Sequence, residues 1–217
     1  MREQDAAGFV LAGGRSSRMG RDKALVEFCG EPLVVGALGI LSGAGLAASI
    51  AGARSALGSI APVVEDLEPG LGPLGGICSA LALTAADNMV RWGVFVPVDL
   101  PLLPASLVEY LVNHAEVTGA AVTLVSVTGF AQTFPAVLAR AALPWLQSEL
   151  AAGRRGCFAA FQAAAAGLGQ PVSVVAAELL VQAGQVAHPE GLPASLWFLN
   201  VNSEGNLRRA EAHRTRG

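Results

Sequence analysis

The sequence predicts an α/β fold in three layers, with a mainly parallel central sheet covered by helices on both faces. Short apolar runs, which suit strands buried on both faces, alternate along the chain with longer segments of helical spacing. The chain has 217 residues, of which 53% are hydrophobic and 14% are charged. This is enough for one α/β domain with a substantial core, so we expect residues 1–217 to form a single domain.

The elements of the amino-terminal half follow from their apolar spacing. A first buried strand at 8–12 ends at Gly13-Gly14, a pair that favours a tight turn. A helix at 32–41 begins at a proline, which suits a first helical turn. The further elements that we expect are strands at 46–51 and 61–64, a helix at 74–86, a strand at 92–98 and a helix at 103–115.

The carboxyl-terminal half continues this alternation. Ser203 can cap a last helix to about residue 212, because its hydroxyl can accept a hydrogen bond from the first helical turn. A parallel sheet of this kind binds ligands at the carboxyl ends of its strands, so the loops after Ala12 and Val98 are where we expect a site. The other elements that we expect are strands at 120–127, 172–176 and 196–201, and helices at 139–151 and 157–166.

Charge and cysteine content argue against several classes of function. The formal net charge of −3 is unsuited to a broad nucleic-acid-binding face. The three cysteines are odd in number and widely spaced, so we expect reduced thiols and no zinc site. Residues 32–53 carry no charge, but glycines interrupt them, and we expect no membrane span. The first residues lack a signal-peptide pattern, so we expect a cytoplasmic protein.

The loop at residues 11–23 carries the clearest chemical signal, with the sequence Leu-Ala-Gly-Gly-Arg-Ser-Ser-Arg-Met-Gly-Arg-Asp-Lys. Its glycines let backbone N–H groups approach phosphate, and Arg15, Arg18 and Lys23 supply positive charge. This composition is suited to a polyphosphate. The spacing differs from a Walker loop, since Lys23 has no serine or threonine after it, and from the dinucleotide-binding fingerprint.

Asp99 follows the expected strand at 92–98 and stands between Pro97 and Pro101. A lone carboxylate there is costly to bury unless it meets a cation or hydrogen-bond donors. Magnesium takes one or two carboxylates and completes its shell with water and substrate phosphates, so Asp99 alone can begin a metal site. The alternative is that Asp99 only caps the next helix.

Several segments, in a fixed order, resemble one family. Residues 11–25 are similar to the signature of the MobA-type molybdenum cofactor guanylyltransferases, within the nucleotidyltransferase superfamily. The resemblance spans nearly the whole chain and implies an α/β, Rossmann-like three-layer fold of the nucleotide-diphospho-sugar transferase type. The later segments that match are Val64-Glu65-Asp66, Gly72-Pro73-Leu74-Gly75-Gly76, Pro97-Val98-Asp99-Leu100-Pro101 and Phe198-Leu199-Asn200-Val201-Asn202-Ser203.

The resemblance implies transfer of GMP from GTP to the terminal phosphate of molybdopterin or molybdenum cofactor, with Mg²⁺ as the metal. Asp99 would coordinate Mg²⁺, and Lys23, Asp99 and Arg18 would be catalytic. Molybdenum insertion or acceptor enzymes are candidate protein partners. No nucleophile elbow appears, which favours direct displacement with release of pyrophosphate. The residues implied for GTP binding are Leu11, Ala12, Gly13, Gly14, Lys23, Asp66, Gly76 and Asp99.

Some of these positions have simpler interpretations. Asp66 also fits a solvated turn, and residues 72–76 also fit a helix-entry turn. Asn200 and Asn202, two apart at the expected last strand, would share one face on the acceptor side, or be structural. Arg154 and Arg155 lie in a glycine-bounded loop. They would either contact the phosphate of the acceptor or be solvated surface residues without a role.

Two alternative functions stay open. A sister enzyme, such as a molybdopterin cytidylyltransferase or a sugar-phosphate nucleotidyltransferase, is one, because a fold and a phosphate loop do not fix the base or the acceptor. Gly14 and the Asp22-Lys23 pair favour the guanylyl branch. The other is a non-catalytic nucleotide-binding protein, because Ala51 stands where the family often has asparagine. Phe134, just before a proline, also departs from the usual polar residue.

Overall fold

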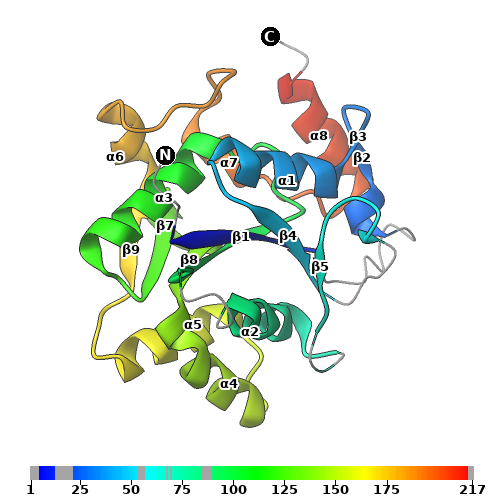
Figure 1. The fold of residues 1–217 in the computed structure, drawn as a ribbon. Coiled ribbons are helices and arrows are strands. Elements are labelled where there is room, and N and C mark those ends of the chain that lie inside the picture. Colours follow the sequence, from blue (N-terminus) through cyan, green and yellow to red (C-terminus); the bar gives the residue numbers. More distant parts are fainter. Residues whose placement is uncertain are drawn as a thin grey trace.

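The fold is a seven-stranded sheet with helices on both faces, in the strand order β5-β4-β1-β6-β8-β7-β9 (Figure 1). A computed structural model describes residues 5–12, 22–52, 57–66, 68, 70–84 and 89–214. Most neighbouring strands of the sheet are parallel. The expected α/β fold in three layers is therefore confirmed.

The sheet has a parallel part in which apolar strands are buried on both faces. Val10, Val94 and Val96 are fully buried there, as continuous apolar runs predict. This part consists of β5 (Val63–Val64), β4 (Ala48–Ala51), β1 (Ala6–Leu11) and β6 (Trp92–Pro97). Two further parallel strands, β7 (Val122–Val127) and β9 (Ser173–Ala176), pair beyond it.

Strand β8 (Phe130–Ala139) was not expected from the sequence, and it runs antiparallel to both β6 and β7. Thr128 and Gly129 both have positive φ, 50° and 81°, so the chain reverses there and β8 returns as a hairpin with β7. The first half of β8 is exposed or half-buried and its second half is buried, so it shows no single periodicity. In the sequence, only the turn residues Thr128 and Gly129 could have indicated this hairpin.

Helices cover the two faces of the sheet in separate groups. One group packs Leu33, Leu107 and Trp197 into one apolar cluster, and the other packs Ile77 and Phe161 into a second. On the first face lie α1 (Leu33–Gly43), α3 (Ala105–Thr118), α6 (Ala177–Gln182), α7 (Ala194–Trp197) and α8 (Glu204–Arg214). On the second lie α2 (Gly72–Thr84), α4 (Leu143–Ala151) and α5 (Cys157–Gly167) (Figure 1). Short elements complete the fold: the 3-10 turns η1 (Lys23–Leu25) and η3 (Arg140–Ala142), and the two-stranded sheet of β2 (Glu27–Phe28) and β3 (Glu31–Pro32).

The strand expected at 196–201 is wrong. Residues 194–197 form the short helix α7 with Pro193 at its N-cap, and the chain is irregular from there to α8. Trp197 explains the difference, because its ring is buried in the core and its Nε1–H donates to the carbonyl of Leu192 at 2.8 Å. That bond ties the Trp197 side chain to the segment before α7, and the backbone N–H of Leu196 donates to the carbonyl of Pro193 at 2.9 Å within the turn, whereas the apolar run by itself suited a strand.

Candidate functional site

The carboxyl ends of β1, β4 and β6 lie side by side, because Leu11 pairs with Ala51 in β4 and with Pro97 in β6. Backbone hydrogen bonds extend this edge beyond the strands. The N–H of Ala12 donates to the carbonyl of Ala51 at 3.2 Å, and the N–H of Val98 donates to the carbonyl of Leu11 at 3.3 Å. The loops that follow these strands therefore open onto one edge of the sheet, where parallel sheets bind ligands.

Lys23 reaches this edge at the end of the loop that follows β1. It begins η1, and the side chain of Asp22 caps this turn by accepting a hydrogen bond from the N–H of Ala24 at 3.1 Å. Ala24 is fully buried and anchors the turn in the core. The position of Lys23 is therefore set by a local cap and by burial of its neighbour.

Asp99 stands just beyond β6, as expected. Its backbone carbonyl accepts a hydrogen bond from the N–H of Val201 at 2.9 Å, so the segment before α8 lies against it. Helix α3 begins at Ala105, with Pro104 as its N-cap. The alternative that Asp99 only caps the next helix is therefore wrong.

Lys23 and Asp99, 76 residues apart in the sequence, form an ion pair. The Lys23 Nζ lies 2.7 Å from Asp99 Oδ2, and the two side chains are 15% and 19% exposed. At this distance the pair is also a charge-assisted hydrogen bond. The carboxylate at the strand end thus meets a cation, as its shelter from water requires.

The ammonium of Lys23 also donates to Oδ1 of Asn202. The neighbours of Asn202 are both anchored, since Val201 is fully buried and the Ser203 hydroxyl accepts a hydrogen bond from the N–H of Asn206 at 3.2 Å. The predicted cap of the last helix by Ser203 is confirmed. Sequence reasoning missed the contact between Asn202 and Lys23, and no local pattern indicates it.

The two asparagines do not share the face of a strand, because the expected strand is absent from this described segment. Asn202 contacts Lys23, whereas Asn200 Nδ2 donates to the carbonyl of Phe198 in its own segment at 3.4 Å. Their environments therefore differ, and the reasoning that paired them on one face is wrong.

Asp66 and Gly76 lie together on the β4–β5 side of β1, opposite β6. Gly72 and Gly76 both belong to α2, so residues 72–76 form a helix entry. A Cβ at Gly76 would lie 3.3 Å from Asp66 Oδ1, which is a buried atom, and 3.8 Å from the backbone nitrogen of Gly52. The missing side chain of Gly76 thus lets α2 approach the carboxylate of Asp66 closely.

Ala51 ends β4 with its side chain in the core. It is 2% exposed and belongs to the apolar cluster that contains Val64 and Leu74. This position contributes only its backbone to the site edge, through the bond with Ala12. Because Ala51 stands in place of the family's asparagine, a small apolar side chain packs against helix α2 at this position.

The remaining candidates for phosphate binding fall into two groups. Gly13, Gly14 and Arg18 belong to residues 13–21, which lie outside the described residues. Arg154 makes two contacts of 2.6 Å with the carboxylate of Glu149 at the end of α4, and Arg155 donates to the carbonyl of Gly70 at 3.0 Å. Both guanidinium groups of this second pair are thus engaged within the protein.

The cysteines are free thiols, as expected. Burial raises the pKa of Cys78 to about 12, helped by the nearby Cys157, and burial raises the pKa of Cys157 to about 11. Cys29 is exposed in the β2–β3 turn. The thiols of Cys78 and Cys157 remain protonated near neutral pH, which makes them poor nucleophiles.

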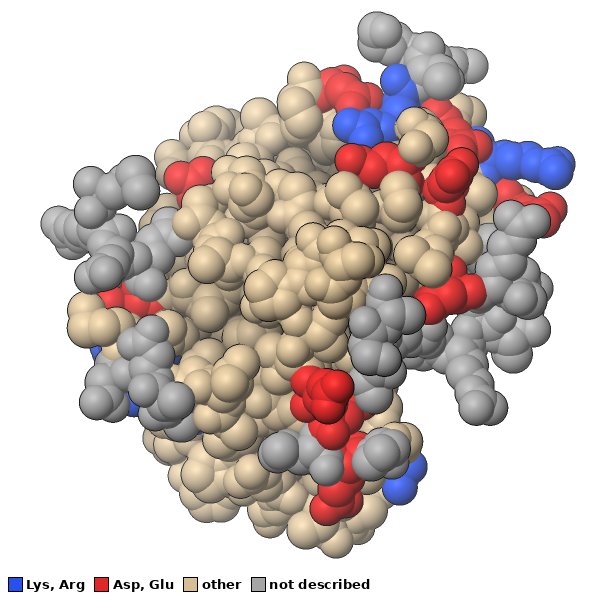
Figure 2. Space-filling model, turned by 45° about the vertical axis from the view of Figure 1, so that its right-hand side comes forward, with Lys and Arg blue, Asp and Glu red and all other residues tan. Residues whose placement is uncertain are grey.

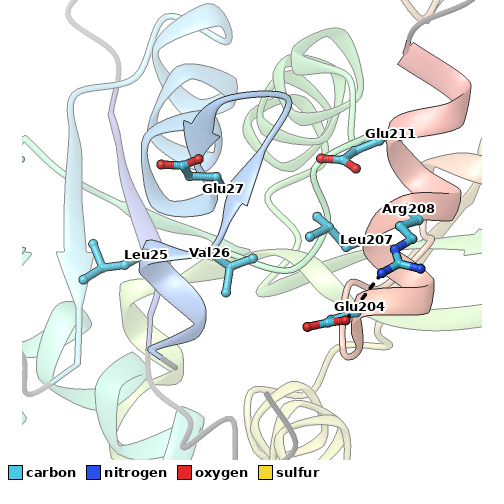
Figure 3. A pocket seen from close by; sticks show the side chains of 7 residues that line it. All are labelled: Leu25, Val26, Glu27, Glu204, Leu207, Arg208 and Glu211. Carbon is cyan, nitrogen blue, oxygen red and sulfur yellow. Dashed lines mark ion pairs between the residues drawn. The ribbon is translucent and has the colours of Figure 1, made fainter. Parts of the chain in front are cut away.

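A groove of about 440 Å³ lies between the η1–β2 segment and α8 (Figure 3). Its walls carry three carboxylates and one guanidinium, so their net charge is negative and does not suit a triphosphate. Charged side chains gather over this α8 region, whereas the middle of the same face carries few (Figure 2). The residues that line the groove are Leu25, Val26, Glu27, Glu204, Leu207, Arg208 and Glu211.

Two properties of the described ranges bear on the class of site. In those ranges no helix combines the length and the apolar character that crossing a bilayer requires. Nor do three His, Cys, Asp or Glu side chains of the same ranges converge as a set of metal ligands.

Comparison with known proteins gives a family match for residues 8–192, described as "MobA-like NTP transferase domain". A molybdenum cofactor guanylyltransferase from Xanthomonas euvesicatoria is 47% identical over 110 residues, which cover 50% of this chain and 54% of that protein. One from Pseudomonas putida is 36% identical over 151 residues, covering 67% and 76%. The chain thus spans about half the length of the Xanthomonas protein that it matches.

Solved structures share the fold at low identity. Molybdopterin-guanine dinucleotide biosynthesis protein A from Archaeoglobus fulgidus superposes with a TM-score of 0.76 at 21% identity, over 97% of this chain and 100% of that one. The 4-diphosphocytidyl-2C-methyl-D-erythritol synthase from Anaerococcus prevotii superposes with a TM-score of 0.67 at 12% identity, over 97% and 96%. At these identities the likeness concerns the fold alone.

Proposed function

This chain belongs to the MobA-like NTP transferase family, and on that basis we propose that it transfers GMP from GTP to the terminal phosphate of molybdopterin or molybdenum cofactor. The observation that carries the proposal is the meeting of Lys23 with Asp99 at the carboxyl ends of β1 and β6. A cation for phosphates and a carboxylate for a metal are the two groups that nucleotidyl transfer needs.

Asp99 is the residue that would hold Mg²⁺. Its carboxylate is largely sheltered and already accommodates one cation, the ammonium of Lys23, so the position fits a positive charge. One carboxylate is sufficient for Mg²⁺ when substrate phosphates and water complete its shell. The bound ion would neutralise negative charge on the phosphates and on the departing pyrophosphate.

Lys23 would bind the phosphates of GTP. An ammonium has three N–H donors, of which Asp99 and Asn202 each accept one. Exchange of the Asp99 contact for a phosphate oxygen would leave the lysine with the same number of hydrogen bonds. The backbone of Leu11 and Ala12 would lie along the nucleotide, with Gly13, Gly14 and Arg18 of the adjoining loop as further phosphate ligands.

Asp66 and Gly76 would form the base side of the nucleotide site. The carboxylate of Asp66 lies close to α2 where Gly76 has no side chain, on the side of β1 away from Asp99. This arrangement separates a region for the nucleoside from the region for the phosphates. The guanine would lie near Gly76.

The proposed reaction is a direct displacement at the α-phosphorus of GTP. An oxygen of the acceptor's terminal phosphate forms a bond to that phosphorus, and the bond from the α-phosphorus to the bridging oxygen breaks. Pyrophosphate leaves with the electron pair, and the guanine dinucleotide cofactor is the product. Lys23 would contribute by holding the phosphates in line and by neutralising their charge.

Pyrophosphate release tests the proposal. The full chain is supplied with Mg²⁺, molybdopterin and one of GTP, CTP, ATP or UTP, and release is expected with GTP. Lys23→Met and Asp99→Asn are each expected to lower the rate by about 100-fold or more. Preference for CTP would overturn the guanylyl assignment and indicate a sister enzyme. Binding of nucleotide without release of pyrophosphate would indicate a non-catalytic nucleotide-binding protein.

A further inference from the structure

Asn202 is the second partner of the Lys23 ammonium, and the contact joins segments 179 residues apart. The lysine side chain is 15% exposed, and its ammonium lies between a carboxylate oxygen and an amide oxygen. The amide oxygen differs from the carboxylate in one respect that matters at a phosphate site. It accepts a hydrogen bond without carrying a full negative charge.

The fold anchors the backbone on both sides of Asn202 through contacts that do not involve Lys23. On one side the fully buried Val201 donates its N–H to the carbonyl of Asp99 at 2.9 Å. On the other side Ser203 is bonded twice to Asn206, through the N–H at 3.2 Å and through the side-chain amide oxygen at 2.8 Å. Asn202 therefore stands between two anchored neighbours, at the start of α8.

We propose that Asn202 is a positioning residue, whose Oδ1 keeps the Lys23 ammonium at the phosphates once Asp99 has turned to its metal. The inference rests on the proposed function, in which Asp99 changes partner when substrate binds. Lys23 has a long, flexible side chain with substantial rotamer entropy, and it loses its charged partner at that moment. A neutral acceptor on an anchored backbone limits this freedom without competing with the phosphates for the charge of the lysine.

A different role for Asn202 would be direct contact with the acceptor. In that case the acceptor's Michaelis constant would depend on this residue, and the affinity for GTP alone would not. The positioning role predicts that the affinity for GTP alone depends on Asn202, because Lys23 binds GTP whether or not an acceptor is present. Affinity for GTP without acceptor therefore separates the two.

The experiment measures the GTP dissociation constant of the full chain with Mg²⁺ and no acceptor, by calorimetric titration. The variants are Asn202→Leu, Lys23→Met and the double variant, with Asn200→Leu as the matched control, since Asn200 bonds to its own segment. Asn202→Leu is expected to weaken GTP about ten-fold, the loss of one hydrogen bond to a charged group. In the Lys23→Met background the same change is expected to have an effect of less than about two-fold, because its partner is gone.

The outcomes separate this inference from the proposed function. Equal loss of affinity in both backgrounds, or no loss with Asn202→Leu, would overturn the positioning role. Full GTP affinity in Lys23→Met would overturn the proposed function itself. Thermal unfolding of each variant checks its fold, and Asn202→Ala replaces Asn202→Leu if the larger side chain prevents folding.

Discussion

The ion pair between Lys23 and Asp99 is expected to stabilise the protein in the absence of nucleotide, and a double-mutant cycle measures by how much. Fully exposed pairs couple by about 0.2–1 kcal/mol, whereas breaking a buried pair costs about 3–5 kcal/mol. At 2.7 Å, with exposures of 15% and 19%, this pair falls between the two cases. We therefore expect a coupling free energy of about 1–2 kcal/mol.

The cycle uses Asp99→Asn, Lys23→Met and the double variant in urea unfolding, with EDTA present and nucleotide absent. Each single variant leaves one charge of the pair without its partner, so each is expected to lose stability. The double variant leaves neither charge, and its loss should be smaller than the sum of the two. For a chain of this size the coupling corresponds to about 2–8 °C in Tm.

Additive losses would refute this reasoning. If the double variant equals the sum of the singles within about 0.5 kcal/mol, the two charges do not depend on each other. Measurement of the same cycle at high salt is a further check, because salt screens exposed charges much more than sheltered ones. A coupling that disappears in salt would mean that the pair is solvated rather than sheltered.

Two glycines and the thiols test other parts of the structure. Gly39→Ala is expected to raise the free energy of unfolding by about 0.5–1 kcal/mol in urea, since Gly39 lies exposed within α1 and a Cβ there meets nothing within 4 Å; a loss would contradict that open space. Gly76→Ala is expected to weaken GTP about three- to ten-fold in a binding titration, because its Cβ would press on the Asp66 carboxylate at 3.3 Å, and an unchanged affinity would exclude this carboxylate from the site. At pH 8 a disulfide reagent should label Cys29 quickly and Cys78 only after unfolding. Because folding raises the pKa of Cys78 from 9.0 to about 12, its contribution to stability is complete below pH 9 and is lost as the pH rises toward 12, which unfolding at several pH values checks.

The residues that could be predicted from the sequence are those whose local surroundings define them. Asp99 follows a continuous apolar strand, and Lys23 ends a glycine-rich loop, so the pattern of the chain is sufficient to assign both to one edge of a parallel sheet. The fold brings them to within 2.7 Å. The strand order that achieves this follows from pairing of β1 with β6, which apolar runs alone do not specify.

The parts that could not be predicted depend on contacts that a local pattern does not contain. Asn202 and Lys23 lie 179 residues apart, and they meet because the segment before α8 returns to Asp99. Strand β8 was missed because its burial pattern changes halfway. Helix α7 was expected as a strand because the apolar run alone does not indicate that Trp197 is buried and bonded to Leu192. In each case packing and hydrogen bonding outweighed the local pattern.

The charges of Lys23 and Asp99 satisfy each other, and this restricts what can bind to the site. Phosphates alone would draw Lys23 away and leave the sheltered carboxylate of Asp99 without its cation, whereas Mg²⁺ alone would leave the ammonium of Lys23 without its anion. Under the proposed function, a nucleotide with its metal would replace both partners at once: phosphate would replace Asp99 at Lys23, and Mg²⁺ would replace Lys23 at Asp99. The uncharged amide of Asn202 is the contact that this exchange leaves in place. Under the proposed function, the pair would therefore favour the metal–nucleotide complex over either of its components.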